Sequence, residues 1–296
     1  MRLSCLFVVS ILFAGCHPSA PTVPLVPYRN WESNSIQSNG IRLHYWRTNS
    51  KGKPVMILAH GITDYGLNWA DFAATFEDDF DIIMYDARGH GFSEKPDGPY
   101  TLEAHMQDLV GLIQALDIQK PILVGHSMGG SVVALTAATY PDLPAAIILE
   151  DPPMEEALEK LNVDILQDWK QWVTTMTHTP KSKLMKGART QYHPGWTEFE
   201  YDHWAESKRL VSPNVIDILK GDGFGNPREI FSKIAAPTLI LKADAEEEFR
   251  KRHLEAAGLL PNGRLIHIDG ANHVIRNDKP EAVEKEVRAF LSDVFS

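Results

Sequence analysis

The sequence predicts an α/β protein, with a mostly parallel central sheet, helices on both faces of that sheet and a helical cap inserted after the sixth main strand. Two observations predict this class. Short apolar runs, typical of buried parallel strands, alternate with longer segments of helical pattern along most of the chain. The alternation stops between residues 152 and 235, where no convincing strand interrupts helical patterns rich in aromatic residues. Strands and helices that alternate form a parallel sheet with both faces covered.

The expected strands are short segments of two kinds. The first alternates apolar and polar residues, as a half-exposed strand does, and the others are mainly apolar, as buried strands are. They lie at residues 41–46, 54–59, 81–85, 121–124, 145–149, 237–241 and 264–268. The helices expected between and after these strands lie at residues 102–116, 128–139, 247–258 and 280–295.

The N-terminus has the form of a secretory signal at residues 1–15. A short basic start precedes an apolar stretch, and Ala14 and Gly15 are small residues directly before Cys16. This ending resembles a bacterial lipobox, in which the cysteine is lipidated and becomes the mature N-terminus. We therefore expect an exported, membrane-anchored lipoprotein that faces the periplasm or the cell exterior. An ordinary cleaved signal peptide is the alternative, and the proline-rich residues 16–35 would form a tether.

Length, charge and cysteine content restrict the remaining possibilities. A chain of 296 residues suits one α/β domain with an insertion, here a core at 36–151 and 236–296 and a cap at 152–235. The formal net charge of −10 argues against a nucleic-acid partner, because phosphate binding relies on basic patches. Both cysteines precede the expected core, which therefore holds neither a disulfide nor a cysteine-based metal site.

Aromatic residues are concentrated in the expected cap. At helical spacing such residues usually pack in a core, although over a cleft some of them line an apolar pocket. The residues concerned are Trp169, Trp172, Tyr192, Trp196, Phe199, Tyr201 and Trp204.

The segment Gly125-His126-Ser127-Met128-Gly129 carries the chemistry. It follows a buried strand and precedes a helix, which is the context of a nucleophile elbow, G-x-S-x-G, where a sharp turn exposes a serine hydroxyl. A helix N-terminus at this point offers free amides to a developing oxyanion. Ser127 is therefore the predicted nucleophile of a hydrolase.

A serine hydroxyl needs a base, usually a histidine that a carboxylate orients. His273 follows the last expected strand, where its loop can reach over the sheet edge, so we predict it to be the base. Two pairs of carboxylates are placed to orient it, one after each of two neighbouring strands, and spacing does not decide between them. These are Glu150 with Asp151, and Asp244 with Glu246.

The oxyanion hole has a weaker signal. His60 and Gly61 follow the strand expected at residues 54–59, and the next residue, Ile62, can present its backbone amide. The second donor would be the amide of Met128, the residue after the nucleophile.

Four segments together resemble the α/β-hydrolase family. They are His60-Gly61, Asp86 to Ser93, Gly125 to Gly130 and the Gly-Ala-Asn-His segment that ends at His273. The resemblance covers the chain from about residue 36 onward, and it implies that Asp86 to Ser93 is a structural loop. Family members with a serine at the elbow are mostly esterases, lactonases, lipases, peptidases and carbon–carbon bond hydrolases. Epoxide hydrolases and haloalkane dehalogenases of this fold use an aspartate nucleophile, so neither activity is expected.

A resemblance to a smaller group of family members bears on which carboxylate orients His273. Some bacterial members end their sixth strand in Glu-Asp-Pro-Pro, here residues 150–153, and carry an aspartate at the position of Asp244. This favours Asp244, followed by Glu246 and then Asp151. The segment Lys242-Ala243 departs from the glycine that many members have there.

We therefore expect a hydrolase of small-molecule carboxylic esters or lactones with a fairly small or apolar acyl part. No metal ion or organic cofactor is implied. The only expected membrane contact is the anchor at Cys16. The alternatives are carbon–carbon bond or amide hydrolysis by the same residues, and a ligand-binding protein that keeps the hydrolase fold without its activity.

Overall fold

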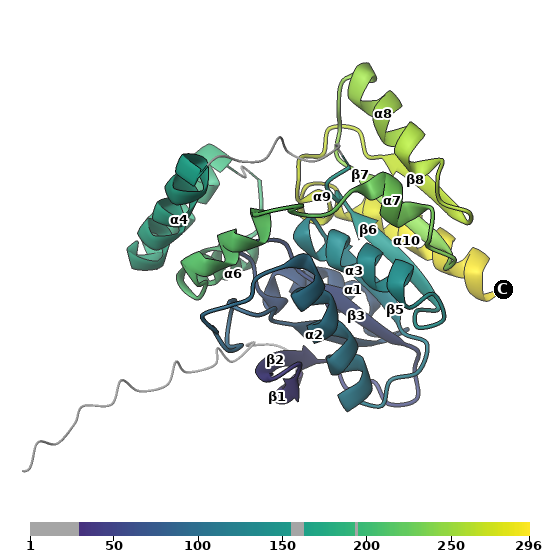
Figure 1. The fold of residues 1–296 in the computed structure, drawn as a ribbon, viewed down its shortest axis with the longest axis horizontal. Coiled ribbons are helices and arrows are strands. Elements are labelled where there is room, and N and C mark those ends of the chain that lie inside the picture. Colours follow the sequence, from purple (N-terminus) through teal and green to yellow (C-terminus); the bar gives the residue numbers. More distant parts are fainter. Residues whose placement is uncertain (1–29, 155–162, 193–194) are drawn as a thin grey trace, which may run out of the picture.

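The computed structural model describes residues 30–154, 163–192 and 195–296 (Figure 1). Eight strands form one sheet in the order β1-β2-β4-β3-β5-β6-β7-β8. β1 and β2 pair antiparallel, β2 pairs antiparallel with β4, and all the other neighbours are parallel. Their bounds are β1 Glu32–Ser38, β2 Ile41–Arg47, β3 Val55–Ala59, β4 Asp81–Tyr85, β5 Ile122–His126, β6 Ala146–Glu150, β7 Thr238–Lys242 and β8 Gly263–His267.

Helices cover both faces of the sheet, because the strands send alternate apolar residues to opposite sides. Ile57 of β3 belongs to a buried cluster with the helices at residues 102–115, 128–139 and 247–257, whereas its neighbour Leu58 belongs to a second cluster with the helices at residues 70–76 and 280–295. The bounds of the helices outside the cap are η1 Gly66–Trp69, α1 Ala70–Phe76, α2 Leu102–Ala115, α3 Met128–Thr139, α7 Pro227–Phe231, α8 Glu247–Ala257, α9 Ile275–Asp278 and α10 Pro280–Phe295.

The predicted mostly parallel sheet with helices on both faces is confirmed. All seven predicted strands and all four predicted helices are present within two residues of their expected ends. One strand was missed: β1, whose mostly polar and exposed residues carry no apolar pattern. Because β1 begins at Glu32, the expected boundary between tether and core at residue 35 falls inside a strand and moves toward the N-terminus.

Between β6 and β7 the regular secondary structure of the described residues is helical. α7 falls within the expected cap range of 152–235 but packs against α3 and α8 of the core. We use "the cap" for the helices α4 Val163–His178, α5 Lys181–Gly187, η2 Ala188–Tyr192, α6 Glu198–Arg209 and η3 Pro213–Leu219. The start of α6 is fixed by a capping box, in which Thr197 accepts from the amide of Glu200 and the Glu200 carboxylate accepts from the amide of Thr197. The cap has a small buried cluster of its own, made of Leu184, Ala188, Trp196, Tyr201, Trp204 and Ala205.

None of the helices in the described part of the chain is long and apolar enough to cross a membrane. The expected signal segment, Cys16 and most of the expected tether lie outside the described residues, as do residues 155–162 and 193–194 of the expected cap.

Candidate active site

Ser127 lies in a strained turn between β5 and α3. Its backbone has φ 52° and ψ −117°, a conformation that L-residues rarely adopt. Its amide donates to the carbonyl of Glu150 at 2.9 Å, which ties the turn to the end of β6. A Cβ on Gly125 would collide with the carbonyl of Gly129, and a Cβ on Gly129 would collide with the carbonyl of Ala59. The two glycines therefore let the turn close, and the turn presents the serine.

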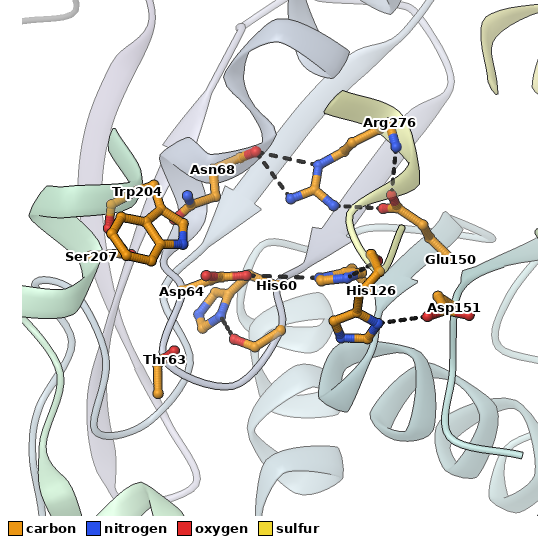
Figure 2. Close-up of polar contacts among 12 residues, drawn as sticks. His60, Thr63, Asp64, Asn68, His126, Glu150, Asp151, Trp204, Ser207 and Arg276 are labelled. Atoms are coloured by element: carbon orange, nitrogen blue, oxygen red, sulfur yellow. Dashed lines mark hydrogen bonds and ion pairs between the residues drawn. The ribbon is translucent and has the colours of Figure 1, made fainter. Parts of the chain in front are cut away.

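His273 faces Asp151. The loop after β8 carries His273, whose Nδ1 lies 2.6 Å from Oδ2 of Asp151. Figure 2 marks this contact with a dashed line to Asp151, at the end of β6. The other carboxylate oxygen of Asp151 lies 2.7 Å from Nζ of Lys242 and accepts the amide of Ala243. These contacts hold the carboxylate in one orientation, and it in turn orients the imidazole.

The charge state of Asp151 fixes the histidine tautomer. Burial would raise the pKa of Asp151, but the hydrogen bond with His273 and the charge of Lys242 hold this pKa well below its usual range. An ionised carboxylate only accepts, so Nδ1 of His273 carries a hydrogen and Nε2 is left as the basic nitrogen. That arrangement is the one a general base needs beside a serine hydroxyl.

The preference for Asp244 as the acid is corrected by this geometry. Asp244 is exposed and contacts Arg250 and the amide of Gly270 instead of His273. Those contacts hold the start of the loop that carries His273. Glu246 is also exposed and stands at the N-cap of α8. Asp151, the third choice from the sequence, is the carboxylate that contacts the histidine.

The two predicted oxyanion donors, the amides of Met128 and Ile62, come from the start of α3 and from the loop after β3. Met128 is the first residue of α3, where helix amides have no intrahelical partner. Ile62 follows Gly61 in the loop after β3, and it lines the same cavity as Ser127 and His273. We call residues 61–64 the oxyanion loop.

Two buried histidines brace the oxyanion loop. His60 donates from Nδ1 to the carbonyl of Gly61 and accepts the amide of Ala87 at Nε2. His90 donates to the carbonyl of Arg88 and accepts the amide of Thr63 at Nε2. Burial lowers the pKa of both histidines, which keeps each imidazole neutral and able to accept. The motif residues His60 and His90 are therefore part of the scaffold.

An ion pair joins the cap to the oxyanion loop. Lys208 of α6 lies 2.7 Å from Oδ1 of Asp64 and donates to the carbonyl of Thr63 at 3.1 Å. Burial would raise the pKa of Asp64, but the charge of Lys208 and the nearby His126 hold it well below its usual range. His126 donates from Nε2 to the carbonyl of His273 at 2.9 Å, so this network also reaches the loop that carries His273.

A second buried ion pair, between Glu150 and Arg276, was not predicted from the sequence. Arg276 donates to both carboxylate oxygens of Glu150, at 2.8 Å through its amide and 2.6 Å through its guanidinium (Figure 2). The guanidinium also binds the carbonyl of Asn68 and lies 4.0 Å from the centre of the Trp69 ring. Arg276 and Glu150 are 126 positions apart, so no local sequence pattern predicts that they pair. The sequence indicated only that Glu150 ends a buried strand near the site.

These residues enclose a cavity of about 260 Å³. Ser127, His273 and the oxyanion loop form its floor, and Trp172, Met176 and Trp204 of the cap line it from above. Among the described residues no group of three or more His, Cys, Asp or Glu side chains is arranged to hold a metal ion.

The comparisons with known proteins agree with this fold. A family model for the alpha/beta hydrolase fold matches residues 54–185. Epoxide hydrolase 1 of Caenorhabditis elegans is 25% identical over 88% of this chain and 70% of its own length. The bifunctional esterase/perhydrolase DCH of Acinetobacter calcoaceticus is 23% identical over 86% of this chain and 97% of its own. The crystal structure of E-2-(acetamidomethylene)succinate hydrolase matches with a TM-score of 0.75 at 22% identity, over 88% of this chain and 99% of that one.

The family model, the curated relatives and the structural matches together support an α/β-hydrolase superfamily member. The chain is a hydrolase of that fold. The cavity that contains Ser127 and His273 lies at the carboxyl ends of the parallel strands, where ligands bind in open α/β sheets.

Proposed function

We propose that this hydrolase cleaves carboxylic esters or lactones through an acyl-enzyme on Ser127. The observation that carries the proposal is the 2.6 Å contact between His273 and the ionised Asp151, in a cavity that Ser127 also lines. A serine, a histidine with its basic nitrogen free and a carboxylate that orients it are the groups that acyl transfer requires.

Each group has one role in this mechanism. His273 takes the proton of the Ser127 hydroxyl as the oxygen attacks the substrate carbonyl, and the amides of Ile62 and Met128 stabilise the oxyanion. His273 then gives that proton to the leaving alcohol. A water molecule, deprotonated by His273, attacks the acyl-enzyme and releases the acid. Asp151 stays ionised and stabilises the imidazolium in both halves of the reaction.

Epoxide hydrolysis, the activity in the name of the C. elegans relative, is not part of the proposal. A carboxylate that opens an epoxide becomes an ester, which water can cleave at its carbonyl. A serine oxygen that opened an epoxide would become an ether, which has no carbonyl for water to attack. With Ser127 at the elbow, the enzyme would remain alkylated after one turnover.

The proposal is tested by replacing Ser127 with alanine and measuring hydrolysis of p-nitrophenyl butyrate. We expect turnover to fall to background, whereas Ser131→Ala, which changes a buried serine one turn further along α3, retains it. Undiminished turnover in Ser127→Ala would contradict the proposal. Amide and carbon–carbon bond substrates in the same panel distinguish the alternative reactions, and a ligand-binding protein would turn over none of them.

We also propose that the chain is exported and lipidated at Cys16, as its first 16 residues suggest. Expression in a bacterial host with a clickable palmitate analogue tests this proposal. Label that is present in the wild type and absent in Cys16→Ser is expected, and label in neither protein would favour an ordinary cleaved signal.

A further inference from the structure

A second, mainly apolar groove of about 510 Å³ lies beside the catalytic cavity. The oxyanion loop forms one wall, through Ile62 and Thr63, and cap elements α4 and η3 form the other. Its lining residues are Ile62, Thr63, Asp168, Trp169, Trp172 and Ile216. Ile62, Thr63 and Trp172 also line the catalytic cavity, so the groove continues from the point where the oxyanion would form.

Two tryptophans make this groove unusual. Trp169 and Trp172 are one turn apart on α4, and their exposed fractions are 43% and 46%. Side chains of this size are normally well buried, and adjacent exposed aromatic residues mark surfaces that bind something apolar. The other cap tryptophans, Trp196 and Trp204, are only 7% and 8% exposed and belong to the buried cap cluster.

The position of His273 decides which half of an ester would occupy the groove. The leaving alcohol must receive its proton from His273, so it lies on the side of the cavity formed by His273, Val274 and Asn277. None of these three residues lines the groove. The acyl half then points the other way, past Ile62 and toward Trp169.

We infer that this groove binds the acyl chain of the substrate and that the chain is an unbranched, medium-length aliphatic group. This inference rests on the proposed function and narrows it to a substrate class. The walls offer indole and aliphatic surface, whereas the one charged lining residue, Asp168, disfavours an anionic chain terminus. Burial of each added methylene in such a groove raises kcat/KM by up to about fourfold, because binding energy gained along the chain is also present in the transition state.

A series of p-nitrophenyl esters from acetate to octanoate tests the inference. In the wild type we expect kcat/KM to rise with chain length, and in Trp169→Ala we expect it to rise much less. Trp169→Phe should restore most of the chain-length dependence. Phe249→Ala, which removes a 44% exposed aromatic residue from α8, is the matched control and should leave the series unchanged.

A binding measurement keeps the inference separate from catalysis. Octanoate, below the concentration at which it forms micelles, should bind saturably to Ser127→Ala and much more weakly to Ser127→Ala/Trp169→Ala in calorimetry. Acetate turnover with a flat chain-length series and no octanoate binding would overturn the inference and leave the proposed function intact. Self-association of the wild type that Trp169→Ala abolishes, with a flat series, would likewise overturn it and assign the surface to a second copy of the chain. Loss of all ester turnover would overturn the proposed function, and octanoate binding would then decide whether the groove takes an alkyl chain.

Discussion

Replacement of Asp151 by asparagine removes the negative charge beside His273 and keeps the size of the side chain. The asparagine amide donates to Nδ1, so the imidazole proton moves to Nε2, the nitrogen that must accept the proton of Ser127. In a serine protease the equivalent change lowers kcat by roughly 10⁴-fold, which corresponds to about 5 kcal/mol of transition-state stabilisation. We expect a loss of that size here, measured as kcat/KM on p-nitrophenyl butyrate.

The same substitution affects folding through Lys242. Its Nζ lies 2.7 Å from Asp151, and its side chain is 8% exposed, so the asparagine leaves a buried ammonium without a counter-ion. Loss of one partner of a buried ion pair lowers the free energy of unfolding by about 3–5 kcal/mol. Lys242 keeps its hydrogen bond to the Pro152 carbonyl, so we expect a loss near the lower end of that range. Asp151→Asn/Lys242→Met should therefore recover stability in urea unfolding without recovering activity. This double variant separates the catalytic loss from unfolding.

Asp244→Asn is the matched control, because its side chain is exposed and its pair with Arg250 lies at the surface. We expect activity within about threefold of the wild type, since exposed ion pairs contribute little and the asparagine still accepts the Gly270 amide. The assignment of the acid would be refuted if Asp244→Asn lost 10³-fold or more while Asp151→Asn stayed within tenfold.

Three further predictions concern the scaffold of the site. Gly129→Ala should destabilise the fold by about 1–3 kcal/mol in urea unfolding, because its Cβ would collide with the rigid carbonyl oxygen of Ala59. Gly130→Ala should cost less, because its Cβ would come no closer than 3.1 Å to Pro152 and 3.3 Å to the carbonyl oxygen of Gly125; equal effects of the two substitutions would contradict this. Lys208→Met should lower kcat about tenfold or more, because the oxyanion loop loses its contacts with the cap. It should also lower stability, because Asp64 stays buried without a counter-ion, and the added substitution Asp64→Asn should recover that stability. An unchanged kcat would refute the role of the Lys208–Asp64 ion pair in holding the oxyanion loop. Burial lowers the pKa of His105 to about 4, below its unfolded value of about 6.5, so the unfolded state binds more protons in that window and stability falls as the pH drops from 6.5 to 4. His105→Gln should make this decline in stability with falling pH shallower. An unchanged slope of unfolding free energy against pH would show that His105 does not cause the decline.

The central sheet and the positions of Ser127 and His273 beside one cavity could be predicted from the sequence, because each depends on a local pattern. Ser127 is marked by glycines whose roles follow from the close approach of backbone atoms, and His273 by its place after the last strand. The acid was different. Asp151 and Asp244 follow the adjacent parallel strands β6 and β7, so both reach the same edge of the sheet. The choice is made by the backbone of Asp151, which has φ 42° and directs its carboxylate to His273, and no local pattern encodes that turn.

The cap shows a similar limit. Aromatic spacing alone does not separate tryptophans that pack with one another from those that line a binding surface. In the structure Trp196 and Trp204 are buried in the cap cluster and border the catalytic cavity, while Trp169 and Trp172 are half-exposed and line the second groove. The groove is formed jointly with Ile62 and Thr63 of the oxyanion loop, which is about a hundred residues away in the chain, so local spacing does not indicate it. The ion pairs Asp64–Lys208 and Glu150–Arg276 were missed for the same reason.

Covalent labelling of the purified protein by a fluorophosphonate tests the central claim most directly. Only a serine activated by a neighbouring base reacts at an appreciable rate. Intact mass should increase by one adduct, peptide mapping should locate it on Ser127, and the label should be absent from Ser127→Ala and strongly slowed in Asp151→Asn. An unlabelled wild type, or a label that persists in Ser127→Ala, would contradict the account.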